Sequence, residues 1–170
     1  NQERLFVVRS GQQLLQRCDL RTMQSEATET LPEGAVVTNA VMGYDGDGPL
    51  GLVAKEKLFL WDVETLKAMR VIGEQLSGNM YMVSADGRVF AGWPTGYSPA
   101  NFTFMRVEGN KTVLAKDPKG WSYNESWAVP NADGSLMLTT NGLYAADLEV
   151  MPSGERAKHT CMRCVDRRLI

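Results

Sequence analysis

The amino-acid sequence predicts an all-β fold made of blades, each of them a small sheet of four short antiparallel strands. Three observations lead to this prediction. Short apolar runs alternate with turn residues, which is typical of strands. One strand-and-turn pattern recurs at intervals of 41 to 44 residues, and Asp-Gly turns recur in the same order. A repeat of this length can hold four short strands and their turns.

The strand-and-turn pattern is clearest at Leu58–Lys67. Residues 58–61 form a continuous apolar run, which predicts a strand buried on both faces. The side chains of Asp62 and Thr65 can bond to nearby backbone N–H groups, so a tight turn should follow. A second apolar run at residues 68–72 predicts the returning strand of a hairpin.

Weaker copies of this pattern occur before and after it. They place Asp19, Arg106 and Asp147 at the position of Asp62, at intervals of 43, 44 and 41 residues. A repeat of about this length with four strands in each copy is characteristic of blades arranged in a ring. The sequence therefore predicts several copies of one structural unit.

A second marker lies one strand pair earlier in each copy. Gly48, Gly87 and Gly134 end Asp-Gly turns at intervals of 39 and 47 residues. Such turns need a positive φ angle, which glycine adopts without strain. Because two independent markers recur in the same order, we interpret the pattern as a true structural repeat.

The arrangement resembles the Trp-Asp repeat and related bacterial β-propeller families. Residues Leu60–Lys67 carry the resemblance, because the Trp61-Asp62 pair followed by a turn is similar to the typical end of a propeller blade. No Gly-His dipeptide, the other mark of that repeat, occurs in the chain. The resemblance implies a propeller scaffold that makes protein–protein contacts, and it implies no reaction.

The repeat predicts a propeller-like region at residues 1–150 and a basic, cysteine-containing tail without repeats at residues 151–170. The expected blades are residues 1–33, 35–73, 80–117 and 121–150. The expected strands are residues 4–9, 12–19, 24–30, 35–42, 50–54, 57–62, 67–72, 80–84, 88–93, 102–107, 112–115, 126–129, 135–139 and 143–146. About three and a half blades result, whereas a ring closes with roughly 4–8. We therefore expect a larger propeller, completed by another chain or by a second copy.

Composition sets further bounds. A hydrophobic content of 44% and a net charge of −2 are ordinary for a globular protein, so neither nucleic acid nor a membrane surface is an expected partner. No apolar run is long enough to span a bilayer. We expect a soluble protein whose compartment, cytoplasmic or secreted and periplasmic, stays open. The three cysteines argue against a disulfide framework because their number is odd.

Aromatic residues near predicted loops are the candidates for partner binding. Trp93 and Tyr97 flank a long loop in the third blade, and Trp121 and Tyr123 lie at the next connection between blades. Loops on a propeller rim often contact partners, and Trp and Tyr dominate contact energies. The alternative for Trp93, and for Trp127, is packing between blades.

The tail contains the most suggestive pattern of metal-ligand type. His159, Cys161 and Cys164 have spacings that would let three side chains reach one zinc ion, although a structural zinc site normally needs four ligands. Cys161 and Cys164 could also form a redox pair. The third alternative is an exposed or disulfide-closed tail without metal.

These observations favour a non-enzymatic interaction scaffold that docks a protein or peptide. No Gly-x-Ser-x-Gly motif and no phosphate-binding loop occurs, so neither a nucleophile nor a cofactor is expected. One alternative is part of a propeller-type hydrolase or lyase whose catalytic residues lie outside this chain. Another is a metal or redox module built on the cysteine pair of the tail.

Overall fold

The computed structural model describes residues 4–45, 48–55, 57–69, 79–93, 95, 103–109, 111–115, 127–140 and 142–145. In these residues the chain forms β-strands and one short 3-10 helix, η1 (Ser10–Gln12). Every strand pairs with its neighbours in an antiparallel manner, which confirms the all-β prediction. None of the described residues belongs to a helix of the length and apolarity that crossing a membrane requires.

The strands form four small sheets, and each sheet is built from consecutive strands. The first sheet contains β1 (Arg4–Arg9), β2 (Leu14–Asp19) and β3 (Ser25–Thr30). The second contains β4 (Val37–Val41), β5 (Leu50–Ala54) and β6 (Lys57–Trp61). The third contains β7 (Met80–Val83), β8 (Val89–Trp93), β9 (Thr103–Glu108) and β10 (Lys111–Ala115). The fourth contains β11 (Ala128–Pro130), β12 (Leu136–Thr139) and β13 (Leu143–Ala145).

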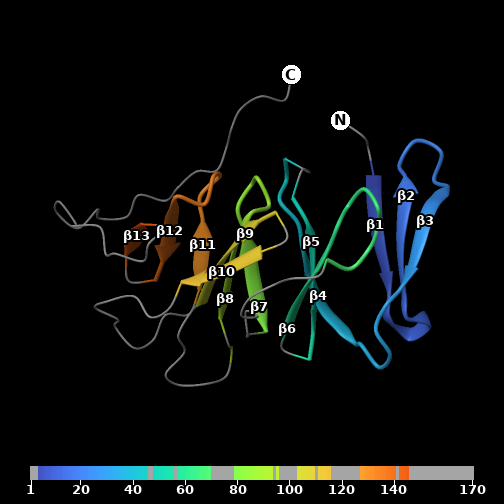
Figure 1. Ribbon diagram of the computed structural model, residues 1–170, viewed down its shortest axis with the longest axis horizontal. Coiled ribbons are helices and arrows are strands. Elements are labelled where there is room, and N and C mark those ends of the chain that lie inside the picture. Colours follow the sequence, from blue (N-terminus) through green and yellow to red (C-terminus); the bar gives the residue numbers. More distant parts are fainter. Residues whose placement is uncertain are drawn as a thin grey trace.

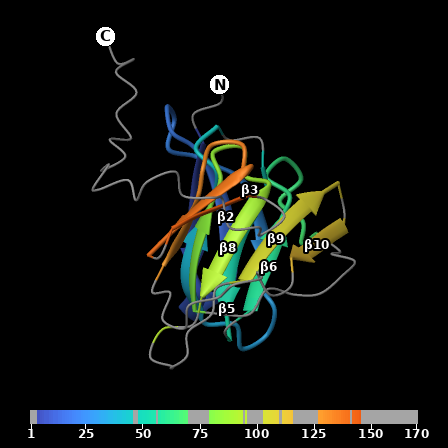
Figure 2. The ribbon, with the colours of Figure 1, turned by 90° about the vertical axis from the view of Figure 1, so that its left-hand side faces the viewer.

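The four sheets follow one another along the longest axis in the order of the chain. Figure 1 shows the first sheet at one end and the fourth at the other. Viewed along that axis, the sheets lie one behind the other (Figure 2). The strands β4, β7 and β11, which begin the second, third and fourth sheets, lie next to one another. The first strand of each of these sheets therefore lies on the same side of the row.

One cluster of buried apolar side chains fills each junction between neighbouring sheets. The cluster between the first and second sheets contains Leu15, Leu31, Leu50, Leu52, Trp61 and Leu66. The cluster between the second and third sheets contains Val53, Leu58, Leu60, Tyr81, Phe90, Met105 and Val107. The cluster between the third and fourth sheets contains Val89, Ala91, Trp93, Phe104, Ala128, Met137 and Tyr144. The hydrophobic effect at these junctions holds the row together.

The middle strands explain the continuous apolar runs of the sequence. All five residues of β5 are buried, and so are all five of β8. Side chains alternate across a strand. Leu52 therefore packs against the first sheet, whereas its neighbour Val53 packs against the third. The interpretation of these runs as strands buried on both faces is confirmed.

Two details of the predicted repeat differ from the structure. Arg106, aligned with Asp62, lies inside β9 opposite Val89 and Val113, so the alignment was wrong at that copy. Its strand continues to Glu108 before it turns. The return strand expected at residues 67–72 is described only as far as residue 69, where it forms a single bridge between Trp61 and Ala68. Asp147 lies outside the described residues.

Candidate functional site: a charged cleft at the turn face

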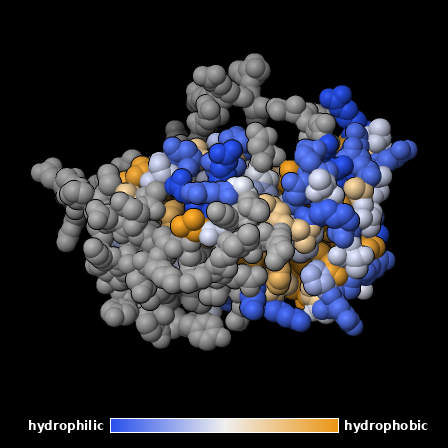
Figure 3. Space-filling model, in the orientation of Figure 1, coloured by the Kyte–Doolittle hydropathy of each residue, from blue (hydrophilic) through white to orange (hydrophobic). Residues whose placement is uncertain are grey.

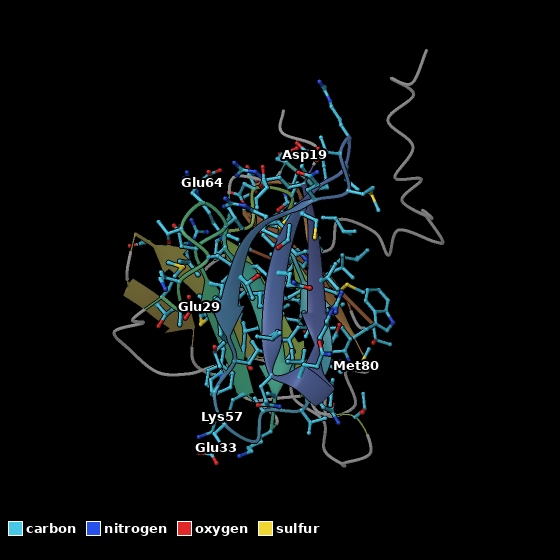
Figure 4. All side chains as sticks on the ribbon, turned by 90° about the vertical axis from the view of Figure 1, so that its right-hand side faces the viewer. Asp19, Glu29, Glu33, Lys57, Glu64 and Met80 are labelled. Atoms are coloured by element: carbon cyan, nitrogen blue, oxygen red, sulfur yellow. The ribbon has the colours of Figure 1, made fainter. Side chains whose placement is uncertain are left out.

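One end of the row of sheets carries the hairpin turns that join the first two strands of the second, third and fourth sheets. Because strands alternate in direction, the turns after β2, β6 and β9 lie at the same end. We call this end the turn face. Figure 4 shows Asp19 and Glu64 at the turn face, and Lys57 and Glu33 at the opposite end. Figure 3 shows hydrophilic residues along the turn face, at the top of the view, in the described part of the surface.

Two turns of this face repeat the same hydrogen bonds. The Asp62 carboxylate accepts the backbone N–H of Thr65 at 2.6 Å and its hydroxyl at 2.8 Å. The Asp19 carboxylate accepts the backbone N–H of Thr22 at 2.8 Å and its hydroxyl at 3.3 Å. The carbonyl of each aspartate also accepts the N–H four residues later. The predicted turn chemistry of these two copies is therefore confirmed.

The turns that join the first two strands of the third and fourth sheets form a second matching pair. Gly87 and Gly134 adopt φ angles of +70° and +67°, as the Asp-Gly pattern predicts. Asp86 accepts the backbone N–H of Arg88 at 3.0 Å. Asp133 likewise accepts the backbone N–H of Ser135 at 2.9 Å. In both turns the Oδ1 atom of the aspartate is fixed by the backbone, so the carboxylate has a set orientation.

Hydrogen bonds also link the turns of the second, third and fourth sheets to one another. The backbone N–H of Asp45 donates to the carbonyl of Ala85 at 3.1 Å, and that of Asp86 donates to the carbonyl of Ala132 at 3.2 Å. Both bonds cross from one sheet to the following one. The turn face is thus a continuous surface across the second, third and fourth sheets.

A cleft with a volume of about 710 Å³ opens at this face. Turns and strand ends of the second, third and fourth sheets line it. The lining residues are Gly48, Pro49, Asp62, Val63, Met69, Asp86, Arg88, Arg106, Val107, Glu108, Gly109 and Asp133. Its size falls within the range typical of ligand-binding clefts.

Charged side chains of both signs line the cleft. Hydrogen bonds to the backbone N–H and hydroxyl of Thr65 hold the pKa of Asp62 below its usual value of 3.8. Hydrogen bonds from Ser135 lower the pKa of Asp133 in the same way. Because each bond favours the charged form, both carboxylates are ionised near neutral pH. Such groups can accept hydrogen bonds but are poor proton donors.

Two arginines supply the positive charge of the cleft. Arg106 donates from Nη2 to the carbonyl oxygen of Gly134 at 3.5 Å, a long contact. Arg88 is exposed. Within the described part of the chain, neither guanidinium forms an ion pair. As far as the described residues go, the other N–H groups of both guanidiniums are therefore available to a carboxylate, phosphate or carbonyl oxygen.

The aromatic candidates of the sequence lie elsewhere. Trp93 is 4% exposed and packs in the cluster between the third and fourth sheets, in line with the packing alternative. It ends β8, so it lies toward the end opposite the turn face. Trp127 is 37% exposed. Tyr97, Trp121 and Tyr123 lie outside the described residues, so their role in partner binding stays a prediction.

The candidate metal ligands His159, Cys161 and Cys164 also lie outside the described residues. The described part of the chain contains no group of three or more potential metal ligands. Cys18 is a free thiol on β2.

Sequence reasoning missed Arg88, Arg106 and Glu108 as site residues. Each lies at or near the turn-face end of a strand, and the cleft contains them because neighbouring sheets place those ends together. One signal was present: Arg88 directly follows an Asp-Gly turn. Arg106 and Glu108 can be placed at the cleft only when β9 is known to end at Glu108.

The comparisons with known proteins agree on the fold. Neither a protein-family model nor a curated protein matches this sequence. Solved β-propeller structures do match its fold. Hydrazine synthase from Kuenenia stuttgartiensis matches with a TM-score of 0.53 at 14% identity, over 79% of this chain and 39% of that chain.

Two further propeller structures give the same result. One is the dihydro-heme d1 dehydrogenase NirN in complex with DHE, with a TM-score of 0.53, 18% identity, and coverage of 84% of this chain and 32% of that chain. The other is Hsv2 from Kluyveromyces lactis, with a TM-score of 0.59 and 12% identity. The match covers 86% of this chain and 45% of that chain.

The four sheets of this chain therefore have the β-propeller fold that the repeat predicted. The chain spans less than half the length of each of these three structures. At such low identity the likeness shows the fold alone, because one fold hosts many functions.

Proposed function

We propose that this chain is a non-enzymatic interaction scaffold of the β-propeller type, and that its turn face docks a peptide segment of a partner protein. The observation that carries the proposal is the charged cleft of about 710 Å³ at that face. It is open to solvent on a continuous surface, where loops of a rigid scaffold commonly bind partners.

The side chains of the cleft suit a polar peptide. Arg88 and Arg106 can donate to the carbonyl groups or carboxylates of a peptide, and Asp62 and Asp133 can accept from its N–H groups or cationic side chains. The turns fix these carboxylates before a partner arrives, so little conformational entropy is lost on binding. Because the lowered pKa of Asp62 and Asp133 keeps both groups charged, binding suits them better than proton transfer.

A peptide selection tests the proposal. A random peptide library displayed on phage would be selected against the immobilised 170-residue chain, and the recovered peptides measured by fluorescence anisotropy. We expect the double variant Arg88→Ala/Arg106→Ala to weaken their binding at least about tenfold, since arginines are common hot spots. The matched control is Lys57→Ala, which removes an exposed cation at the opposite end (Figure 4).

Two results would contradict the proposal. One is a selection that recovers no peptide specific for this chain. The other is peptide binding that Lys57→Ala weakens as much as the double arginine variant does. Circular dichroism of each variant shows whether the sheets remain folded, so a loss of binding can be separated from unfolding.

A further inference from the structure

The fourth sheet ends the row and packs only one of its faces on another described sheet. Met137 and Tyr144 of this sheet are buried in the cluster shared with the third sheet. Because side chains alternate along a strand, Leu136, Leu138 and Leu143 lie on the opposite face. Among the described strands, none packs on that face as a neighbouring sheet.

This opposite face is apolar on all three strands. The register places Val129 opposite Leu138, and Leu138 opposite Leu143. In the next row Leu136 is opposite Ala145. Side chains opposite one another in an antiparallel pair are neighbours on the same face. We call these five residues the fourth-sheet free face; Val129 is 39% exposed, and the other four are half-buried.

The first sheet has a free face with both apolar and polar side chains at the other end of the row. Phe6 and Val8 pack against the cluster shared with the second sheet, so the alternate residues of β1 point away from it. The register adds their partners on β2. On β1 and β2 the resulting first-sheet free face contains Leu5, Val7, Arg9, Leu14, Gln16 and Cys18. On β3 it continues with Thr28 and Thr30, which lie opposite Gln16 and Leu14. Leu5 is 39% exposed.

We propose that the fourth-sheet free face of one copy of this chain packs against the first-sheet free face of a second copy. The three junctions within the chain support this pairing, since each joins one sheet to the sheet that follows it in the repeat. In a repeat protein, equivalent faces meet equivalent neighbours. The fourth-sheet free face is thus equivalent to faces that are covered by the next sheet.

The number of sheets supports a second copy as the occupant. Figure 1 shows the first and fourth sheets at opposite ends of one chain, so a single copy does not bring the two free faces together. Two copies with four described sheets each would contribute eight, and closed propellers contain roughly 4–8 blades. Two head-to-tail junctions would close such a ring with two-fold symmetry.

The mass of the chain in solution tests this inference. Size-exclusion chromatography with light scattering, over a range of protein concentrations, should give a species of twice 18.8 kDa. A mass of 18.8 kDa at the highest concentration would overturn the proposal. Because this measurement uses no peptide, its outcome is independent of the docking function proposed for the turn face.

Variants locate the junction. Val129→Glu and Val7→Glu each place a carboxylate on one free face, and burying an unpaired charge is costly. Each should raise the dissociation constant of the dimer at least tenfold. The matched control is Val113→Glu on β10, at a position that is 53% exposed, and it should leave the dimer unchanged. Thermal melting followed by circular dichroism confirms that each variant is folded.

Mixing the variants distinguishes a head-to-tail dimer from other arrangements. A Val129→Glu chain and a Val7→Glu chain would together restore one junction with no substitution on either side. The mixture should therefore associate more tightly than either variant alone. A dimer that resists both substitutions, or that Val113→Glu weakens equally, would show that other surfaces form it.

Discussion

A Cβ atom added to Gly48 would lie only 2.4 Å from the Cα atom of Gly87. The two glycines belong to the turns of the second and third sheets, so their backbones touch where these sheets meet at the turn face. Gly43 has a similar position, because its Cβ would lie 2.4 Å from the carbonyl oxygen of Ala85. Backbone contact without side chains thus allows neighbouring turns to hydrogen-bond to one another.

We therefore expect Gly48→Ala to destabilise the protein. The added methyl group meets backbone atoms, which cannot move aside as a flexible side chain would, and overpacking of this kind costs about 1–3 kcal/mol. Urea unfolding followed by circular dichroism measures the loss. Gly11→Ala is the matched control, since nothing lies within 4 Å of its Cβ, and it should change the free energy of unfolding by less than about 0.5 kcal/mol. Equal effects would show that the turns do not touch.

The turn after β6 gives a second prediction. Asp62→Ala removes the acceptor for the backbone N–H of Thr65, and this turn also positions the buried side chain of Leu66. By analogy with a helix cap, we expect a loss of about 1 kcal/mol in the free energy of unfolding. Asp62→Asn keeps an oxygen acceptor, so most of the stability should return. If asparagine is as damaging as alanine in urea unfolding, the hydrogen bond is not the cause.

A third prediction concerns the contact between the first and second sheets. The guanidinium of Arg17 donates to the carboxylate of Glu26 at 2.9 Å, to the carbonyl of Val63 at 2.9 Å and to the carbonyl of Glu64. Lysine has a single ammonium group and cannot reproduce this fork of donors. Arg17→Lys should therefore cost about 1–3 kcal/mol of unfolding free energy.

Thermal melting of the Arg17→Lys variant, compared with that of an Arg9→Lys control variant, checks this prediction. Arg9 is exposed, and its guanidinium donates a long hydrogen bond of 3.4 Å to the side-chain oxygen of Gln12. Its replacement should leave the melting temperature nearly unchanged. A similar shift in melting temperature for both variants would mean that the hydrogen bonds of Arg17 do not stabilise the junction between the first and second sheets.

The lowered pKa values of the turn aspartates predict how stability depends on pH. Hydrogen bonds from backbone N–H groups hold the pKa of Asp19 and Asp62 below the usual 3.8, and hydrogen bonds from the hydroxyl and backbone N–H of Ser135 do the same for the pKa of Asp133. Below that pH the unfolded chain binds more protons than the folded one, so stability is full above it and falls as the pH drops toward the folded values. The urea midpoint should be flat from neutral pH to about 5 and then decline. A variant with asparagine at all three positions should decline less steeply; an unchanged slope would contradict the assignment.

Much of the fold could be predicted because its signals are local. The apolar run of β5 indicated a strand buried on both faces, and Asp62 with Thr65 indicated the turn that the structure contains. The register of Arg106 could not be predicted. A strand can lengthen by a few residues while its apolar pattern stays similar, so repeat spacing alone placed this residue in a turn instead of inside β9.

The candidate site was harder to predict than the fold. The cleft depends on which strand ends meet across separate sheets, and sequence spacing does not contain that information. The aromatic pattern predicted that Trp93 contacts a partner or packs between blades, and the structure buries its side chain. A charged residue beside a turn, such as Arg88, gives no sequence signal of a site because such residues are usually solvated.

Chemical-shift mapping by NMR of a selected peptide bound to the ¹⁵N-labelled chain shows which face of the protein docks the peptide. Docking at the turn face predicts that the largest amide shifts lie at Asp62, Arg88, Glu108 and Asp133, which line the cleft. The largest shifts at the opposite end, around Lys57, would contradict it.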